Sequence, residues 1–175
     1  MTQEPPGLPQ NVAAVAAATD DLVTSRARST VAMILGGGDT PTVTLRRAVR
    51  DELVRNRGYR DIIVMEDQPD DGMDPDDKWD RILEQRVPEF FIFVLAKDAR
   101  PGGVHYELGS LRTIFKKAVK DRVCFAFEKN ADLERLSGYL KGIMHRVGCQ
   151  EYVDMPSLVD VIETELRTYA SRLVL

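Results

Sequence analysis

Two carboxylates flank a glycine-containing stretch near the middle of the chain. Asp98 follows the apolar run FFIFVLAK, and Glu107 lies further on in RPGGVHYELGSL, after Gly102 and Gly103. A glutamate at the start of a helix is stabilised by the helix dipole, which is a sufficient structural explanation for Glu107. The helix dipole does not explain the two glycines. Glycines at such a point allow the backbone to come close to a ligand in a crevice. Glu107 is therefore either a reactive group or a helix-terminal acid.

Other polar residues could contact the same ligand. Glu66 and Asp67 follow the apolar run DIIVM, and acids after a second strand can hydrogen-bond ribose hydroxyls. His105 lies close to Glu107 in the sequence, and a histidine there can take part in proton transfer. The acidic run at 65–77 does not match the alternating ligands of a calcium loop, and prolines interrupt it. We interpret it as a solvated loop and expect no metal site.

A run of glycines offers a second candidate ligand contact. The sequence LGGGDTPTV places Gly36, Gly37 and Gly38, and then Asp39, between an apolar run and a helical pattern. Free backbone amides and a helix N-terminus at such a point can hold an anion such as a phosphate. The spacing is not GxGxxG, and the lysine of a P-loop is missing. A tight turn between strand and helix explains the glycines equally well, so both interpretations stay open.

Two further side-chain types are interpreted as structural. Trp79 belongs to a helical pattern and is expected to pack in the core or at the edge of a groove, with stacking on a base as the alternative. Arg46, Arg47 and Arg50 are expected to be solvated or ion-paired. If Arg46 reaches the glycine run, it could serve a phosphate.

The elements that must position these residues alternate regularly from residue 29 onward. Apolar runs predict strands at 29–35, 61–65, 89–95, 122–127 and 149–153, and amphipathic patterns predict helices at 43–58, 77–85, 106–120, 132–147 and 157–173. This alternation predicts an α/β, flavodoxin-like three-layer sandwich with a five-stranded parallel sheet in the order 2-1-3-4-5. Ligands of such sheets bind beyond the carboxyl ends of the strands, between the first and the third. The glycine run and the segment from Asp98 to Glu107 should therefore be adjacent.

Residues 1–28 precede this alternation and are interpreted as an N-terminal appendage, partly helical, which leaves 29–175 as a single domain. The apolar stripe of the appendage contains Val12, Val15 and several alanines. Such a stripe can dock on the domain or on a partner, and packing on the domain is the simpler interpretation.

Composition limits the class of protein. The chain of 175 residues is 43% hydrophobic and 30% charged, with a formal net charge of -4, which argues against broad nucleic-acid binding. Cys124 and Cys149 lack the spacing of a metal site or a disulfide framework, so we expect reduced thiols and a cytoplasmic location. We expect no membrane association, because the sequence has neither an apolar stretch of the ~20 residues that a span requires nor a secretory signal.

The sequence from Ser29 to about Lys117 resembles the nucleoside deoxyribosyltransferase-like superfamily, which neighbours the TIR-type NAD-cleaving domains. The resemblance lies in FFIFVLAKDA, which ends near Asp98, in the glycine-containing loop, and in YELGSL with Glu107. It implies that Glu107 is the nucleophile at the anomeric carbon, and that Asp98 binds the sugar or positions the substrate. The family often has an aromatic residue near the sugar where this chain has its glycine run. PGG…E also resembles the phosphoribohydrolases that release cytokinin bases, although their motif is longer by two residues.

Both resemblances imply cleavage or transfer at the N-glycosidic bond of a small molecule, namely a nucleotide, a nucleoside or NAD. Departure of the base leaves an oxocarbenium-like sugar, which a carboxylate can stabilise or trap as a glycosyl ester. No separate cofactor is expected, because NAD or a nucleotide would be the substrate. A non-catalytic nucleotide-sensing module that signals through a partner is the alternative, and a homo-oligomer stays open. The substrate-binding residues expected beside Glu107 and Asp98 are Gly36, Gly37, Gly38, Asp39, Glu66, Asp67, Gly102, Gly103 and His105.

Overall fold

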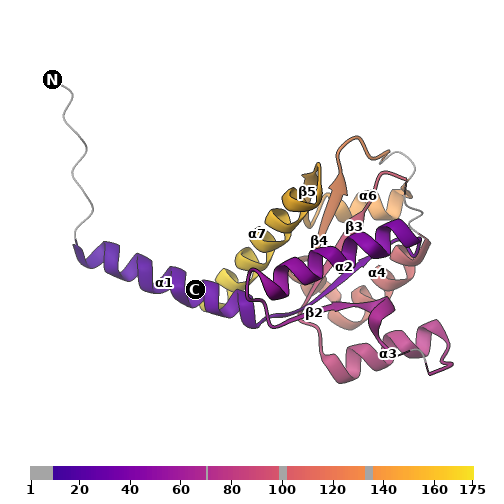
Figure 1. Cartoon of the computed structure of the whole chain (residues 1–175), viewed down its shortest axis with the longest axis horizontal. Helices are drawn as coiled ribbons and strands as arrows, with labels where there is room; N and C mark the ends of the chain where they lie inside the picture. Colours follow the sequence, from indigo (N-terminus) through magenta and orange to yellow (C-terminus); the bar gives the residue numbers. More distant parts are fainter. Residues whose placement is uncertain (1–9, 70, 99–101, 133–135) are drawn as a thin grey trace.

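The computed structural model describes residues 10–69, 71–98, 102–132 and 136–175, and it has three layers with a sheet in the middle (Figure 1). All five strands run parallel, in the order β2-β1-β3-β4-β5. This confirms the predicted fold class and strand order. The strands are β1 (Val31–Gly36), β2 (Asp61–Val64), β3 (Phe90–Leu95), β4 (Val123–Glu128) and β5 (Gly148–Tyr152).

Helices cover both faces of the sheet. One face carries α1 (Gln10–Ser29), α2 (Thr40–Arg55) and α7 (Met155–Val174), and the other carries α3 (Pro75–Arg86), α4 (Gly102–Phe115) and α6 (Gly138–Met144). A short 3₁₀ turn, η1 (Met65–Asp67), follows β2, while η2 (Lys116–Ala118) and α5 (Val119–Arg122) join α4 to β4. None of these described helices is long and apolar enough to cross a bilayer.

The central strands owe their sequence pattern to this double cover. Every residue of β3 is buried, with Ile92 and Val94 in the core beneath α2 and α7, and Phe91 and Phe93 in the core beneath α3 and α4. A strand that is buried on both sides needs apolar residues at every position rather than at alternate ones. The continuous run FFIFVL is therefore the signature of a central strand.

The start of α4 differs from the prediction in a way that moves Glu107. The helix begins at Gly102 rather than at residue 106, so Glu107 lies in its second turn and no acidic residue occupies its first turn. Val104, Leu108 and Leu111 are all fully buried, and their helical spacing extends the apolar stripe of α4 back over the glycines. The dipole explanation for Glu107 therefore loses most of its weight, because the dipole effect is strongest in the first turn.

Two predicted helices are shorter than expected. The helix predicted at 106–120 ends at Phe115, because Lys116 takes the left-handed conformation with φ 50° and breaks the helical register. The helix predicted at 132–147 is represented by α6 (Gly138–Met144), whose N-cap Ser137 accepts a hydrogen bond from the amide of Leu140 at 3.3 Å. Residues 133–135 of that prediction lie outside the described residues.

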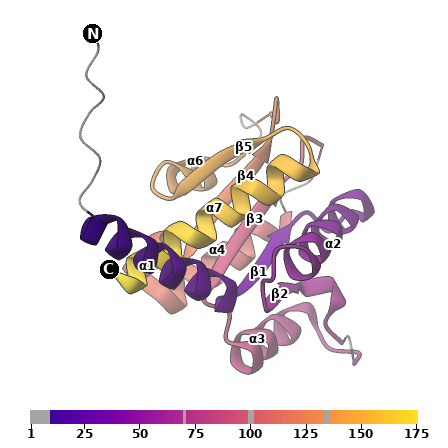
Figure 2. The ribbon, with the colours of Figure 1, turned by 60° about the vertical axis from the view of Figure 1, so that its left-hand side comes forward.

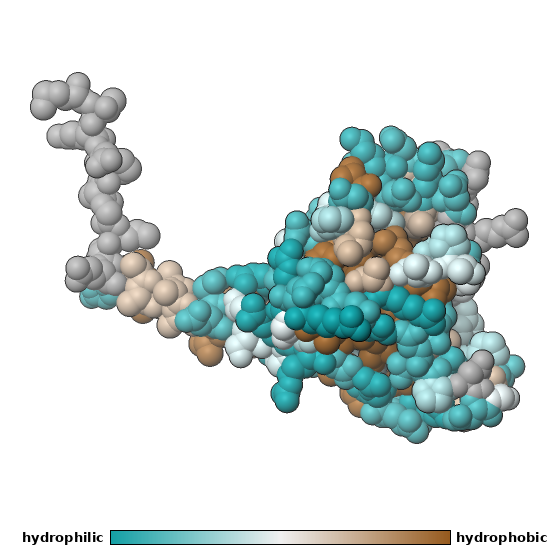
Figure 3. Space-filling model, in the orientation of Figure 1, coloured by the Kyte–Doolittle hydropathy of each residue, from teal (hydrophilic) through white to brown (hydrophobic). Residues whose placement is uncertain are grey.

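The two halves of α1 have different surroundings. Val23 and Ala27 in its C-terminal half are buried in the core, and this half packs against α7 (Figure 2). Val12 and Val15 in its N-terminal half are 47% and 66% exposed, on a part of the helix that extends beyond the sheet layers (Figure 3). The predicted packing on the domain is therefore confirmed for the C-terminal half of α1. It is wrong for Val12 and Val15, the residues from which it was inferred.

Candidate active site

The ends of β1 and β3, which precede the glycine run and Asp98, lie side by side at one edge of the sheet, as the strand order predicted. Gly36 at the end of β1 pairs with Val94 of β3. The chain leaves β1 toward α2 on one face of the sheet, and it leaves β3 toward α4 on the opposite face. This divergence creates the crevice in which α/β proteins of this topology bind ligands.

The members of the glycine run have different surroundings. A Cβ at Gly36 would lie 2.5 Å from the carbonyl oxygen of Val94, so the close approach of β1 and β3 requires glycine there. The carbonyl of Gly37 accepts a hydrogen bond from Arg46 Nη2 at 3.0 Å. A Cβ at Gly38 would have no neighbour within 4 Å, and the residue is exposed. Gly38 is therefore the member of the run that is open to a ligand.

Asp39 has a clear structural task at the same turn. It is the N-cap of α2, and its Oδ1 accepts hydrogen bonds from the amide of Thr42 at 3.0 Å and from the hydroxyl of Thr42 at 2.8 Å. These bonds lower the pKa of Asp39, because they favour its ionised form. Capping by Asp39 fixes the direction in which α2 leaves the edge of the sheet.

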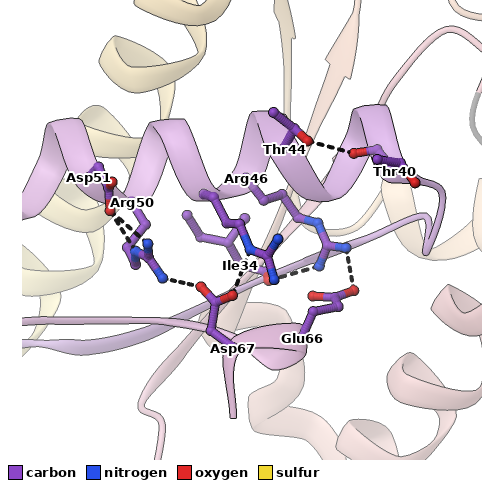
Figure 4. Close-up of polar contacts among 9 residues, drawn as sticks. Ile34, Thr40, Thr44, Arg46, Arg50, Asp51, Glu66 and Asp67 are labelled. Carbon is purple, nitrogen blue, oxygen red and sulfur yellow. Dashed lines mark hydrogen bonds and ion pairs between the residues drawn. The ribbon is translucent and has the colours of Figure 1, made fainter.

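Arg46 of α2 is buried at this edge, with a side chain only 1% exposed (Figure 4). Its Nη1 donates to the carbonyl of Ile34 at 3.4 Å, and its Nη2 donates to Gly37 and to Glu66 Oε1, the latter at 2.5 Å. Its Nε has no hydrogen-bond partner among the described residues. Arg46 is ion-paired as expected, but its burial was not expected, and it does reach the glycine run.

Glu66 and Asp67 both bind arginines of α2 (Figure 4). Glu66, whose side chain is 32% exposed, pairs with the buried Arg46. Asp67 pairs with Arg47 at 2.6 Å and also with Arg50. The two acids lie at the predicted edge of the sheet, and their carboxylates tie the segment after β2 to α2.

Glu107 projects from α4 into the wall of a cavity of about 220 Å³. Its Oε2 is buried and has no hydrogen-bond partner among the described residues. Burial raises the pKa of Glu107 to about 7, Arg46 opposes that shift, and the negative charge of Glu66 adds to it. Glu107 is thus a desolvated carboxyl group that can change its protonation state near neutral pH.

The rest of the cavity wall is mainly apolar and aromatic. It is lined by Met65, Pro75, Asp76, Trp79, Gly103 and Tyr106. Trp79 is held in place, because its indole Nε1 donates to Ser110 Oγ at 2.9 Å and its ring packs against Phe91 with centroids 6.5 Å apart. Tyr106 is 48% exposed at the rim, where partial desolvation and the neighbouring carboxylate of Asp76 raise its pKa. Trp79 is only 1% exposed and packs in the core, as predicted, so the exposed ring of Tyr106 is the one that could hold a flat, weakly polar group beside Glu107.

The remaining residues singled out from the sequence are divided between the cavity and its surroundings. Gly103 lines the cavity, with space for a Cβ 3.9 Å from Glu107 Oε1, and Gly102 lies in the same first turn of α4. Asp98 lies in an exposed turn beyond the end of β3, and no hydrogen bond or ion pair joins it to another described residue. His105 faces α6, with its Nδ1 3.5 Å from Ser137 Oγ. Residues 99–101 of the predicted site loop lie outside the described residues.

Of the contributors to this site, Tyr106 was not considered from the sequence, whereas Arg46 and Trp79 were considered only as secondary possibilities, for a phosphate and for a base. Arg46 left a signal, because it occupies the buried stripe of α2 together with Val49 and Leu53, at the spacing i, i+3, i+7. A charged residue in such a stripe indicates a buried polar contact.

Comparisons with known proteins do not assign the chain to a family. A scan against protein-family models gives no match, and a search of curated proteins finds no significant similarity. Within the described residues, no group of three or more His, Cys, Asp and Glu side chains could hold a metal ion, and Cys124 and Cys149 are free thiols.

Proposed function

We propose that the protein cleaves or transfers at the N-glycosidic bond of a nucleotide, a nucleoside or NAD, with Glu107 as the group that meets the anomeric carbon. The observation that carries the proposal is the buried, unpartnered Oε2 of Glu107 on the wall of an aromatic cavity. A polar atom that is buried without a partner is costly, so it indicates a place where a ligand supplies the partner.

The environment of Glu107 suits the electrostatics of this reaction. As the base departs, positive charge develops on the sugar, and a carboxylate that water does not solvate attracts that charge strongly. The same interaction is weaker with the ground-state substrate, so it lowers the barrier rather than merely strengthening binding. The Arg46 guanidinium, which opposes the raised pKa of Glu107, increases the fraction of Glu107 that is ionised at neutral pH.

In the proposed reaction, a carboxylate oxygen of Glu107 forms a bond to the anomeric carbon while the bond to the base breaks and its electron pair leaves with the base. Water or a second base then attacks the glycosyl ester and frees the carboxylate. Tyr106, at the exposed rim of the cavity, would hold the base. Gly38, at the start of α2, would approach a phosphate, and Asp98 would contact the sugar hydroxyls from the exposed turn.

The test is incubation of the protein with NAD and a panel of nucleosides and nucleotides, with released base measured by chromatography. We expect base release by the wild type, and a loss of at least about a hundredfold in Glu107→Gln. Glu84→Gln is the matched control, because Glu84 is exposed on α3, outside the cavity wall. This variant should release base at the rate of the wild type. Equal turnover by the wild type and Glu107→Gln would remove Glu107 from the reaction.

A sensing module is the second candidate, favoured by the position of η1. Met65 of η1 lines the cavity, while the next two residues, Glu66 and Asp67, pair with α2. A ligand in the cavity would thus contact the segment that ties β2 to α2, so its binding could be transmitted to the surface of α2. A sensor would bind a nucleotide tightly, release no base, and keep its affinity in Glu107→Gln.

A further inference from the structure

A groove of about 530 Å³ lies at the end of the sheet opposite the candidate active site, between the end of α4 and the end of α6. Its floor is aliphatic and consists of Val119, Ile143 and Val147. Around this floor stand five cationic side chains, which we call the basic groove: Arg112, Lys116, Lys117, Lys120 and Arg146. All five of these residues are exposed.

The basic groove differs from the rest of the molecule in its lack of counter-charges. None of its five cations forms an ion pair with a described residue, whereas Arg46, Arg57 and Arg167 exemplify the many arginines that pair with acids elsewhere. The whole chain is acidic, with a net charge of -4. Like charges gathered without partners repel one another, so a negatively charged partner would be bound favourably there.

The same chain carries a surface of complementary character at the start of α3. Met73, which is 36% exposed, lies there among exposed aspartates. We call this surface the acidic face; its carboxylates are Asp74, Asp76, Asp77, Asp80 and also Asp71, which pairs with Arg81 at 2.8 Å. It thus combines an apolar side chain with negative charge, as the basic groove combines an apolar floor with positive charge.

The two surfaces cannot meet within one chain. The acidic face follows the carboxyl end of β2, whereas the basic groove precedes the amino ends of β4 and β5. Helix α4 lies between α3 and α6 on the same face of the sheet (Figure 1). The surfaces are therefore at opposite corners of one face, where a second copy can reach them.

We propose that the protein associates head to tail, with the acidic face of one copy in the basic groove of the next. Met73 would lie on the floor formed by Val119, Ile143 and Val147, and the surrounding aspartates would pair with the lysines. An aliphatic floor suits a methionine better than the bases of a single-stranded nucleic acid, which stack on aromatic side chains. Because the interface is heterologous, a dimer still has one free face on one copy and one free groove on the other, so assembly continues beyond the dimer.

Sedimentation velocity of the full chain over a range of concentrations, at about 0.01 M and about 1 M salt, tests this association. The wild type should form larger species at low salt and dissociate at high salt, because the Debye length falls from roughly 30 Å to 3 Å. A variant of the groove, Lys117→Gln with Lys120→Gln, and a variant of the face, Asp77→Asn with Asp80→Asn, should each associate at least about tenfold more weakly. Lys97→Gln with Lys129→Gln, at exposed lysines outside the groove, should associate like the wild type.

Mixing the groove variant with the face variant gives the sharpest result. The groove variant still has an intact face, and the face variant still has an intact groove. One copy of each can therefore bind the other, and the mixture should form dimers and nothing larger. A wild type that stays monomeric at low salt would overturn the proposal. So would variants that associate like the wild type, or a mixture that forms no dimer or grows beyond it. Circular dichroism of each variant checks that a loss of association is not a loss of folding.

Discussion

Neighbouring arginines of α2 bind neighbouring acids of η1, but in different environments. Arg46 is 1% exposed and pairs with Glu66 beside the cavity that holds Glu107, whereas Arg47 is 47% exposed and pairs with Asp67 at the surface. The surface pair is solvated and screened by salt, so it contributes at most about 1 kcal/mol to stability. The buried guanidinium of Arg46 pairs with Glu66 and attracts the carboxyl group of Glu107, whose Oε2 has no hydrogen-bond partner among the described residues.

The difference shows how the same residue types acquire different chemistry. In water, Arg47 and Asp67 keep ordinary charges that solvent and salt weaken. At the buried edge, desolvation raises the pKa of Glu107 to about 7, and the attraction of Arg46 only partly offsets that shift. The carboxylate of Glu107 is then a group whose charge is poorly stabilised until a positively charged ligand or transition state arrives.

The largest effect on stability is expected from removing the buried arginine. Arg46→Met should lower the free energy of unfolding by about 3 kcal/mol, because Glu66 and the carbonyls of Ile34 and Gly37 lose their donor. Arg47→Met should lower it by less than about 1 kcal/mol. Urea denaturation of both variants makes the comparison, and equal losses would show that the burial of Arg46 has no energetic consequence.

A smaller effect, with a defined pH dependence, is expected from Glu107→Gln. The pKa of Glu107 rises from 4.5 to about 7 on folding, so its contribution to stability is present below pH 4.5 and is lost as the pH rises through 7. Glutamine cannot ionise, and at pH 8 the variant should be more stable than the wild type by on the order of 2–3 kcal/mol. Denaturation at pH 4 and pH 8 measures the gap, which should nearly close at pH 4, below the unfolded pKa of 4.5. A gap that does not change with pH would contradict the desolvation of the Glu107 carboxyl group.

The smallest effect on stability is expected at Asp98, which is exposed and has no described partner. Asp98→Asn should change the free energy of unfolding by less than about 0.5 kcal/mol. If Asp98 holds the sugar hydroxyls, the same variant should raise KM roughly tenfold, the cost of one hydrogen bond to a charged group. Steady-state kinetics beside thermal denaturation separate the two quantities, and an unchanged KM would leave Asp98 outside the site.

The sequence was most informative where burial acts on whole elements. Continuous apolar runs such as FFIFVL predicted the central strands, and the alternation with helices then predicted which loops meet at the carboxyl edge. The start of α4 was missed because Gly102 and Gly103 have no side chains that mark a helix, although burial of Val104 extends the helix over them. The cavity was missed because Met65, Trp79 and Glu107 converge from three separate elements, and side-chain contacts of that kind leave no spacing pattern.

The most direct test of the central claim is the pH dependence of kcat/KM for base release, measured from pH 5.5 to 8.5 with the substrate that the panel identifies. This ratio reports the ionisation of groups in the free enzyme. A nucleophilic Glu107 must be ionised, so kcat/KM should rise as a single proton is lost, with a midpoint near the pKa of about 7. In Glu107→Gln the profile should lie at least about a hundredfold lower and lose that ionisation. A profile that falls with increasing pH, or one that Glu107→Gln reproduces, would contradict the nucleophilic role of Glu107.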